Sequence, residues 1–212
     1  MKNLILSLFV IPGLYASDSV NNEYVEAMRK AITEVYMAQN PAALNGPINA
    51  FERIGKAEPE KWEPRYYKGY GLLMQGIMNE QPEEKDKYFD RALEAVDAGR
   101  EISKDNVELW TLKGFVLMMK LNVDPQARGQ EYAVLAMQAF GKALAIDDQN
   151  PRALYLMASM QYGSAQFMGN DTGEACGMLH KSIKQFDQYE TENPLAPQWG
   201  KAFAEGMLGA CQ

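Results

Sequence analysis

The feature that most constrains the fold is a pattern that the chain repeats three times. Each copy begins with a phenylalanine and places a small or aliphatic residue three positions later, on the same helical face: 51–57, 89–95 and 140–146. A turn and a second helical segment follow each copy, and that segment carries a small residue at an equivalent place: Gly69, Gly114 and Ala158. A small residue there lets two helices approach closely. Such units cannot bury their apolar faces alone, so stacked copies must share one core.

The spacing of these positions resembles that of the tetratricopeptide repeat, a helix–turn–helix unit of about 34 residues. Val35 precedes Phe51 by 16 residues, and Phe51 precedes Gly69 by 18, as in an unmodified repeat. The resemblance implies a right-handed helical solenoid in which the first helices of successive pairs line a concave face.

Two departures from this spacing locate insertions. Phe89 precedes Gly114 by 25 residues, which predicts a second helix lengthened by two turns through 94–103. Gly114 precedes Phe140 by 26 residues, and we place the ten extra residues in a loop at 122–130 that contains proline and glycine.

Four segments resemble a narrower group, the small exported tetratricopeptide proteins of Gram-negative bacteria: 127–132, 147–152, 167–173 and 194–201. The resemblance covers roughly residues 20–212. It implies export and helical repeats. The group is largely uncharacterised and carries over no catalytic residue.

The whole pattern predicts an all-α domain over 17–212, a tetratricopeptide-like solenoid of about four helix pairs with a C-terminal capping helix. We expect helices near 20–39, 44–57, 62–78, 83–103, 106–120, 131–146, 151–163, 172–190 and 197–210. No stretch alternates strongly enough to be a strand. The last helix would cover the open apolar end, as a terminal repeat must.

Residues 1–16 are predicted to be a secretory signal peptide. Lys2 is followed by a short apolar run, a Pro–Gly break and Ala16, after which cleavage is expected. The alternative is a buried amphipathic helix. We expect an exported protein, periplasmic in the first place and secreted as the alternative, with no membrane span because no stretch is long and apolar enough.

Charge and composition exclude several classes of function. A net charge of −7 repels nucleic acid. The one histidine, His180, stands in a polar stretch without a visible partner, and the two cysteines form no zinc pattern. The 13 methionines mostly lie beside leucine at helical spacing and are assigned to core filling. We therefore expect no metal, no cofactor, no catalytic residue and no enzyme.

The strongest candidate for a binding site is a set of side chains, all aromatic but one, at groove positions of the first helices. Counted from the small residue of each pair, these positions are Tyr36, Tyr66, Tyr67, Tyr70, Phe115, Arg152, Tyr155 and Tyr162. Tyrosine combines a large apolar face with a polar tip, which suits recognition of a peptide or protein partner. The alternative is a structural subunit of an envelope complex or a self-associating protein, with the groove filled by residues 120–132 or by a second copy.

The two cysteines are a disulfide candidate. Export would place them in an oxidising compartment. If the last two helices pack antiparallel, Cys176 and Cys211 fall at the same height at their far end. The alternative is two buried free thiols.

Overall fold

A computed structural model describes the backbone of residues 14–211 and the side chains of residues 22–211. Its elements are helical: α1 (Leu14–Met37), η1 (Pro41–Leu44), α2 (Asn45–Ala57), α3 (Glu63–Met78), α4 (Pro82–Ile102), α5 (Val107–Val123), α6 (Pro125–Ile146), α7 (Pro151–Met168), α8 (Gly173–Asp187), α9 (Lys201–Met207) and η2 (Leu208–Cys211). Residues 14–211 contain no strand, which confirms the all-α prediction. Most of the predicted signal peptide, residues 1–13, lies outside the described residues.

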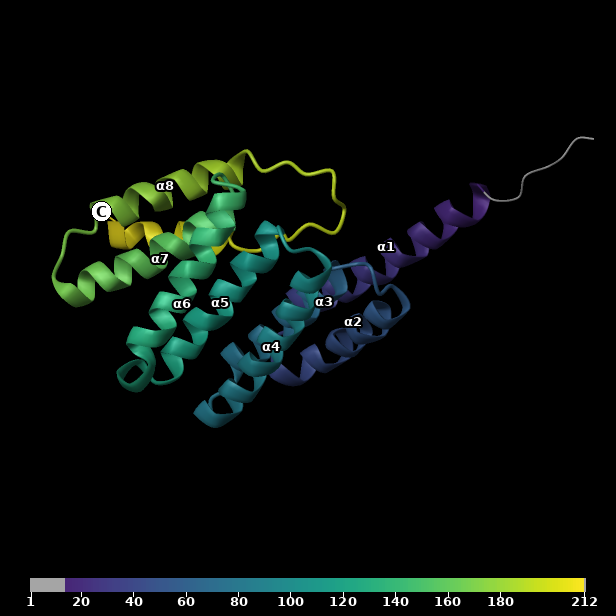
Figure 1. The fold of residues 1–212 in the computed structure, drawn as a ribbon, viewed down its shortest axis with the longest axis horizontal. Helices are drawn as coiled ribbons and strands as arrows, with labels where there is room; N and C mark the ends of the chain where they lie inside the picture. Colours follow the sequence, from purple (N-terminus) through teal and green to yellow (C-terminus); the bar gives the residue numbers. More distant parts are fainter. Residues whose placement is uncertain (1–13, 212) are drawn as a thin grey trace, which may run out of the picture.

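The helices stack as four antiparallel pairs, α1/α2, α3/α4, α5/α6 and α7/α8, in the predicted tetratricopeptide-like solenoid (Figure 1). The small residues lie where the helices of a pair meet. A β-carbon on Gly114 would come within 2.4 Å of the Phe140 ring, and one on Gly69 within 2.8 Å of the Val96 side chain. The repeated phenylalanine and glycine positions therefore fix the distance between paired helices.

The predicted loop at 122–130 is wrong. Asp124 alone separates α5 from α6, and its side chain caps α6 by accepting a 3.1 Å hydrogen bond from the Ala127 amide. Pro125 stands at the first turn of α6, where a missing amide hydrogen does no harm. The ten extra residues instead lengthen both helices, and α5 packs against both α4 and α6.

The C-terminal capping helix is shorter than predicted and begins at Lys201 instead of residue 197. Residues 188–200, which we call the strap, leave α8 and run across the first helices before entering α9 (Figure 1). Gly200 makes the final turn with φ 113°, and a β-carbon there would lie 2.7 Å from the Phe186 ring. Beyond the turn, Ala204 is buried against Ala158 and Leu179, so α9 covers the end of the solenoid.

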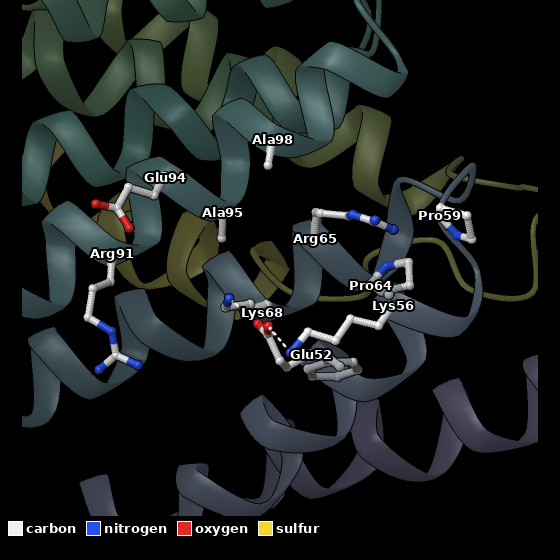
Figure 2. A pocket seen from close by; sticks show the side chains of 12 residues that line it. Glu52, Lys56, Pro59, Pro64, Arg65, Lys68, Arg91, Glu94, Ala95 and Ala98 are labelled. Atoms are coloured by element: carbon white, nitrogen blue, oxygen red, sulfur yellow. Dashed lines mark hydrogen bonds and ion pairs between the residues drawn. The ribbon is translucent and has the colours of Figure 1, made fainter.

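Two further features complete the fold. On the outer side, α2 and α4 leave a cleft above α3 (Figure 2). Among residues 14–211, no helix has the length and apolar character needed to cross a membrane.

Candidate functional site

The concave face carries the predicted tyrosines on α3, but its own chain covers them. Tyr66 and Tyr67 are fully buried. The Tyr67 hydroxyl donates a 2.7 Å hydrogen bond to the Leu195 carbonyl, and the Trp199 indole N–H donates one of 2.9 Å to the Tyr66 hydroxyl. The strap thus fills this part of the groove with Leu195 and Trp199.

Trp199 is held between rings from two helices. Its ring stacks on Tyr70 at 5.6 Å between centroids and lies tilted against Phe115 at 5.5 Å. Tyr36 of α1 packs edge-on against Tyr70 at 5.8 Å, and its hydroxyl accepts a 3.2 Å bond from the Gln198 amide. Burial raises the pKa of Tyr36, so this hydroxyl stays protonated at neutral pH.

A buried ion pair between Arg152 and Glu108 closes the groove next to Tyr189, where the strap begins. The Arg152 guanidinium donates two bonds of 2.8 and 2.7 Å to the carboxylate of Glu108, which also accepts 2.7 Å from the Asn150 amide. The Tyr189 ring lies 4.6 Å from the Arg152 guanidinium. Burial acts to lower the pKa of Arg152, but the Glu108 carboxylate outweighs it and holds that pKa above its ordinary value. Arg152 is therefore a structural cation with no free face for a ligand.

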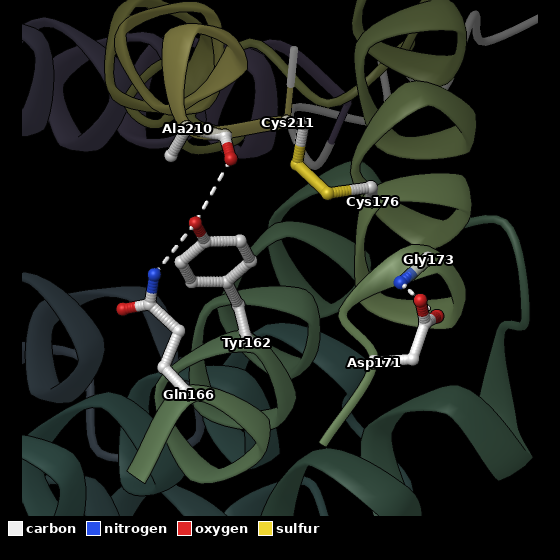
Figure 3. Close-up of a disulfide and its surroundings, with 7 residues drawn as sticks. All are labelled: Tyr162, Gln166, Asp171, Gly173, Cys176, Ala210 and Cys211. Atoms are coloured by element: carbon white, nitrogen blue, oxygen red, sulfur yellow. Dashed lines mark hydrogen bonds between the residues drawn. A yellow bond between two sulfur atoms is a disulfide. The ribbon is translucent and has the colours of Figure 1, made fainter. Parts of the chain in front are cut away.

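The remaining two groove tyrosines lie beyond the strap. Tyr155 is half-buried and packs on both core clusters of the described chain. The Tyr162 hydroxyl donates 2.8 Å to the Ala210 carbonyl and accepts 2.9 Å from the Gln166 amide (Figure 3). The eight predicted groove residues thus do not form one open groove.

The segment that fills the groove is not the one the sequence suggested. Residues 120–132 belong to α5 and α6, while the strap at 188–200 lies over the tyrosines. In the sequence the strap carries Trp199, two prolines and most of the resembling segment 194–201, and none of these indicates which surface it covers.

Cys176 and Cys211 are joined by a disulfide that ties the start of α8 to the end of η2 (Figure 3). Their α-carbons are 5.5 Å apart. The bond fixes the terminal segment next to Tyr162, at the opposite end of α9 from Trp199.

Part of the concave face stays open next to the strap. Its side chains occupy positions one, five and eight after Val35, Gly69 or Gly114. We call them the concave patch: Tyr36, Met74, Ile77, Phe115 and Met119. Two are exposed, at 37% for Tyr36 and 38% for Ile77.

Phe203 of α9 is exposed at 61% and faces away from α8. Lys201 pairs with Asp187 at the end of α8, at 2.8 Å, so its flank of α9 faces α8, and Phe203 follows two residues later on the other flank. Sequence reasoning assigned methionines to the core and missed the patch, although the same register, extended by one turn, reaches Met74 and Met119.

The site offers contact surface instead of reactive groups. Among the described residues, no three His, Cys, Asp or Glu side chains converge to hold a metal ion. His180 is exposed on α8, the outer helix of its pair.

Comparison with known proteins places the chain among tetratricopeptide-like helical repeat structures. The HusA haemophore from Porphyromonas gingivalis superposes with a TM-score of 0.78 at 26% identity, over 89% of this chain and 92% of that one. A thermophilic TPR protein of Thermus thermophilus superposes with a TM-score of 0.52 at 14% identity, over 92% and 93%. No family model and no curated protein matches the sequence. The likeness to the haemophore supports a helical binding or scaffold role, and the likeness to the thermophilic protein supports the fold alone.

Proposed function

We propose that this chain is an exported binding protein that captures a flat, apolar tetrapyrrole of the haem class on its concave patch. The observation that carries the proposal is the likeness to a haemophore over nearly the full length of both chains. The likeness to the thermophilic TPR protein supports the fold alone.

The strap over the tyrosine groove favours a small ligand over a peptide. A peptide in the tyrosine groove would have to displace Leu195 and Trp199, which are both buried and hydrogen-bonded or stacked. The concave patch needs no displacement. Its thioethers adapt to irregular shapes and its rings stack on flat ones, which suits a planar macrocycle.

The residues near the patch favour capture by apolar contact over strong ligation of iron. His180, the one histidine of the chain, lies on the outer helix α8. The patch offers the thioethers of Met74 and Met119 and the protonated hydroxyl of Tyr36, and thioether and phenolate are both known ligands of haem iron. Because the phenolate form of Tyr36 is disfavoured, we expect iron-free protoporphyrin IX to bind nearly as well as haemin.

Titration with haemin and with protoporphyrin IX, followed by absorbance and by quenching of tryptophan fluorescence, tests the proposal. Ile77→Glu places a charge on an exposed part of the patch and should raise Kd about tenfold. Val134→Glu is the matched control, since Val134 is exposed at 51% on the outer helix α6. Equal weakening in both variants, or no saturable binding of either pigment, would rule the proposal out.

A protein partner is the second candidate. Phe167 is 93% exposed and the adjacent Met168 is also exposed, so the end of α7 carries a protruding apolar tip. Exposed apolar patches often mark protein interfaces. Sedimentation of the purified protein tests self-association through this tip, because Phe167→Ser should dissociate such an oligomer without changing pigment binding.

Export belongs to the same proposal. Cleavage after Ala16 would leave a mature chain that starts within α1. Mass spectrometry of protein recovered from the cell envelope or medium should find Ser17 as the first residue. Protein that retains Met1 in the cytoplasm would contradict export.

A further inference from the structure

The outer face carries a charged cleft that the proposed function does not use. The cleft lies between α2 and α4, above α3, and has a volume of about 340 Å³ (Figure 2). Its buried lining is made of small or flat side chains, which leave the hollow: Phe51, Gly55 and Ala95. The exposed Ala98 lines it as well. A cleft of this size accommodates a small organic molecule.

The charge of the cleft opposes that of the chain. Four bases line it, Lys56, Arg65, Lys68 and Arg91, against two acids, Glu52 and Glu94. The local charge is therefore +2, in a chain whose net charge is −7. Low-dielectric walls focus such a field and attract anions.

The bases are only partly neutralised by the protein. Lys56 and Lys68 share one carboxylate, that of Glu52, and these two lysines hold the pKa of Glu52 below its ordinary value. Across the described chain, neither Arg65 nor Arg91 has a carboxylate oxygen within 4.0 Å. Two guanidinium groups are thus left to meet an anion from outside.

Arg65 is held in place before any ligand arrives. One of its terminal nitrogens donates hydrogen bonds of 2.9 Å to the Glu58 carbonyl and 2.8 Å to the Lys61 carbonyl. These two bonds use that nitrogen only and leave the rest of the guanidinium for a ligand. Its guanidinium lies against Gly55, where a β-carbon would come within 3.4 Å of the same nitrogen. A fixed guanidinium binds a carboxylate with little loss of side-chain entropy.

The two guanidiniums lie on opposite sides of the cleft, with Lys68 between them (Figure 2). We propose that the cleft binds a small organic polycarboxylate, with one carboxylate on Arg65, another on Arg91 and its carbon body over the alanines of the lining. A single phosphate does not span two separated guanidiniums, whereas carboxylates at the two ends of an organic body do.

The site is separate from the concave patch. Helix α3 turns Tyr66, Tyr67 and Tyr70 to the strap, and Pro64, Arg65 and Lys68 to the cleft, on opposite sides of its axis. The proposal therefore stands or falls independently of haem binding.

Isothermal titration of the mature protein at low salt, with citrate, acetate and inorganic phosphate as probes, tests this proposal. Citrate should bind saturably, and both acetate and phosphate should bind about tenfold more weakly because each engages one guanidinium. Arg91→Gln should weaken citrate binding about fivefold. Arg91 is exposed and makes no ion pair in the described chain, so this variant should fold normally.

Arg29→Gln is the control, because Arg29 is exposed on α1 and lies away from the cleft. It removes the same charge and should leave citrate binding unchanged. Equal weakening by Arg29→Gln and Arg91→Gln would reduce the effect to overall charge and overturn the site. Phosphate binding as tight as citrate binding, or no saturation by citrate, would overturn it as well.

Discussion

At the scale of single residues, the concave contacts converge on Trp199. Its indole N–H binds the Tyr66 hydroxyl, and its ring packs on Tyr70 and Phe115. A tryptophan that fills a space between two repeats contributes through apolar burial, aromatic stacking and one hydrogen bond together. It is the residue that converts an open solenoid groove into a closed core.

Substitution of Trp199 separates these contributions. Trp199→Ala should lower the free energy of unfolding by about 3–5 kcal/mol, because it leaves a cavity between α3 and α5. Trp199→Phe keeps a ring but loses the hydrogen bond to Tyr66, and should cost about 1 kcal/mol beyond its smaller volume. Urea unfolding followed by circular dichroism measures both. Phe203→Ala is the control, because Phe203 lies on the neighbouring helix α9 and is exposed. A Trp199→Ala midpoint equal to that of the control would contradict this account.

The small residues determine how closely the two helices of a pair approach each other. Gly114 faces the Phe140 ring, where a β-carbon would sit at 2.4 Å, whereas nothing lies within 4 Å of a β-carbon on Gly141. Gly114→Ala should therefore destabilise the chain by about 1–3 kcal/mol through overpacking. Gly141→Ala should stabilise α6 by up to about 1 kcal/mol, since alanine favours a helix. Thermal unfolding of the pair measures both signs, and a neutral Gly114→Ala would show that the ring moves freely.

At the scale of elements, the sequence predicts the helix pairs better than what connects them. The register of Gly69, Gly114 and Ala158 follows from local spacing and holds in the structure. The loop at 122–130 was mispredicted because Pro125 and Gly129 were read as breakers. A proline fits the first turn of a helix, and Gly129 has open space around it, so neither interrupts α6.

The lengthened helices are tied together by one group of charges. The Asp86 carboxylate on α4 accepts bonds of 2.7 and 2.6 Å from Arg128 of α6 and lies 3.3 Å from the Lys120 ammonium on α5. Hydrogen bonding from Arg128, aided by the charge of Lys120, holds the pKa of Asp86 below its ordinary value, against the opposing effect of burial. One carboxylate thus joins three helices.

The pH dependence of this contribution has a definite sign. Because the folded pKa of Asp86 lies below the unfolded value of about 3.9, its contribution is complete above that value and disappears as the pH falls through the folded pKa. Asp86→Asn should lose up to about 1 kcal/mol at pH 7 and little at pH 2. Asp105→Asn is the control, since Asp105 is exposed and makes no ion pair in the described chain. Urea midpoints at several pH values test this, and a constant gap between wild type and Asp86→Asn would contradict it.

At the scale of the whole molecule, the fold presents two different faces. The concave side is closed by the strap over Tyr66 and Tyr67 and stays apolar where it is open, while the outer cleft is cationic. The local spacing of residues predicts neither the closed concave side nor the cationic cleft. The strap, for example, depends on contacts such as that of Tyr67 with Leu195, 128 residues apart. The aromatic positions lie on the first helices of the pairs, but their accessibility depends on the strap, a segment without helical periodicity.

The disulfide determines how firmly the strap and α9 stay in place. Cys211 closes the chain end onto α8, and the Tyr162 hydroxyl binds Ala210 beside it. Removing the bond, by reduction or by the double substitution Cys176→Ser and Cys211→Ser, should lower the free energy of unfolding by roughly 3 kcal/mol for a closed loop of this length.

The region that loosens after reduction is a sharper test than the total loss of stability. The strap reaches back to Tyr36 and Tyr67 on the first helices, whereas each outer helix packs on its neighbours in the solenoid, so loosening the strap should leave the outer helices ordered. Hydrogen exchange followed by mass spectrometry should show faster exchange in residues 188–211 after reduction, while the outer helices α2 and α4 keep their protection. Because Trp199 and Leu195 would loosen with the strap, Tyr66 and Tyr67 should gain accessibility, which tryptophan fluorescence reports independently. Faster exchange spread evenly over all four helix pairs would mean that the terminal segment supports the whole core, and no change would mean that strap contacts alone hold it.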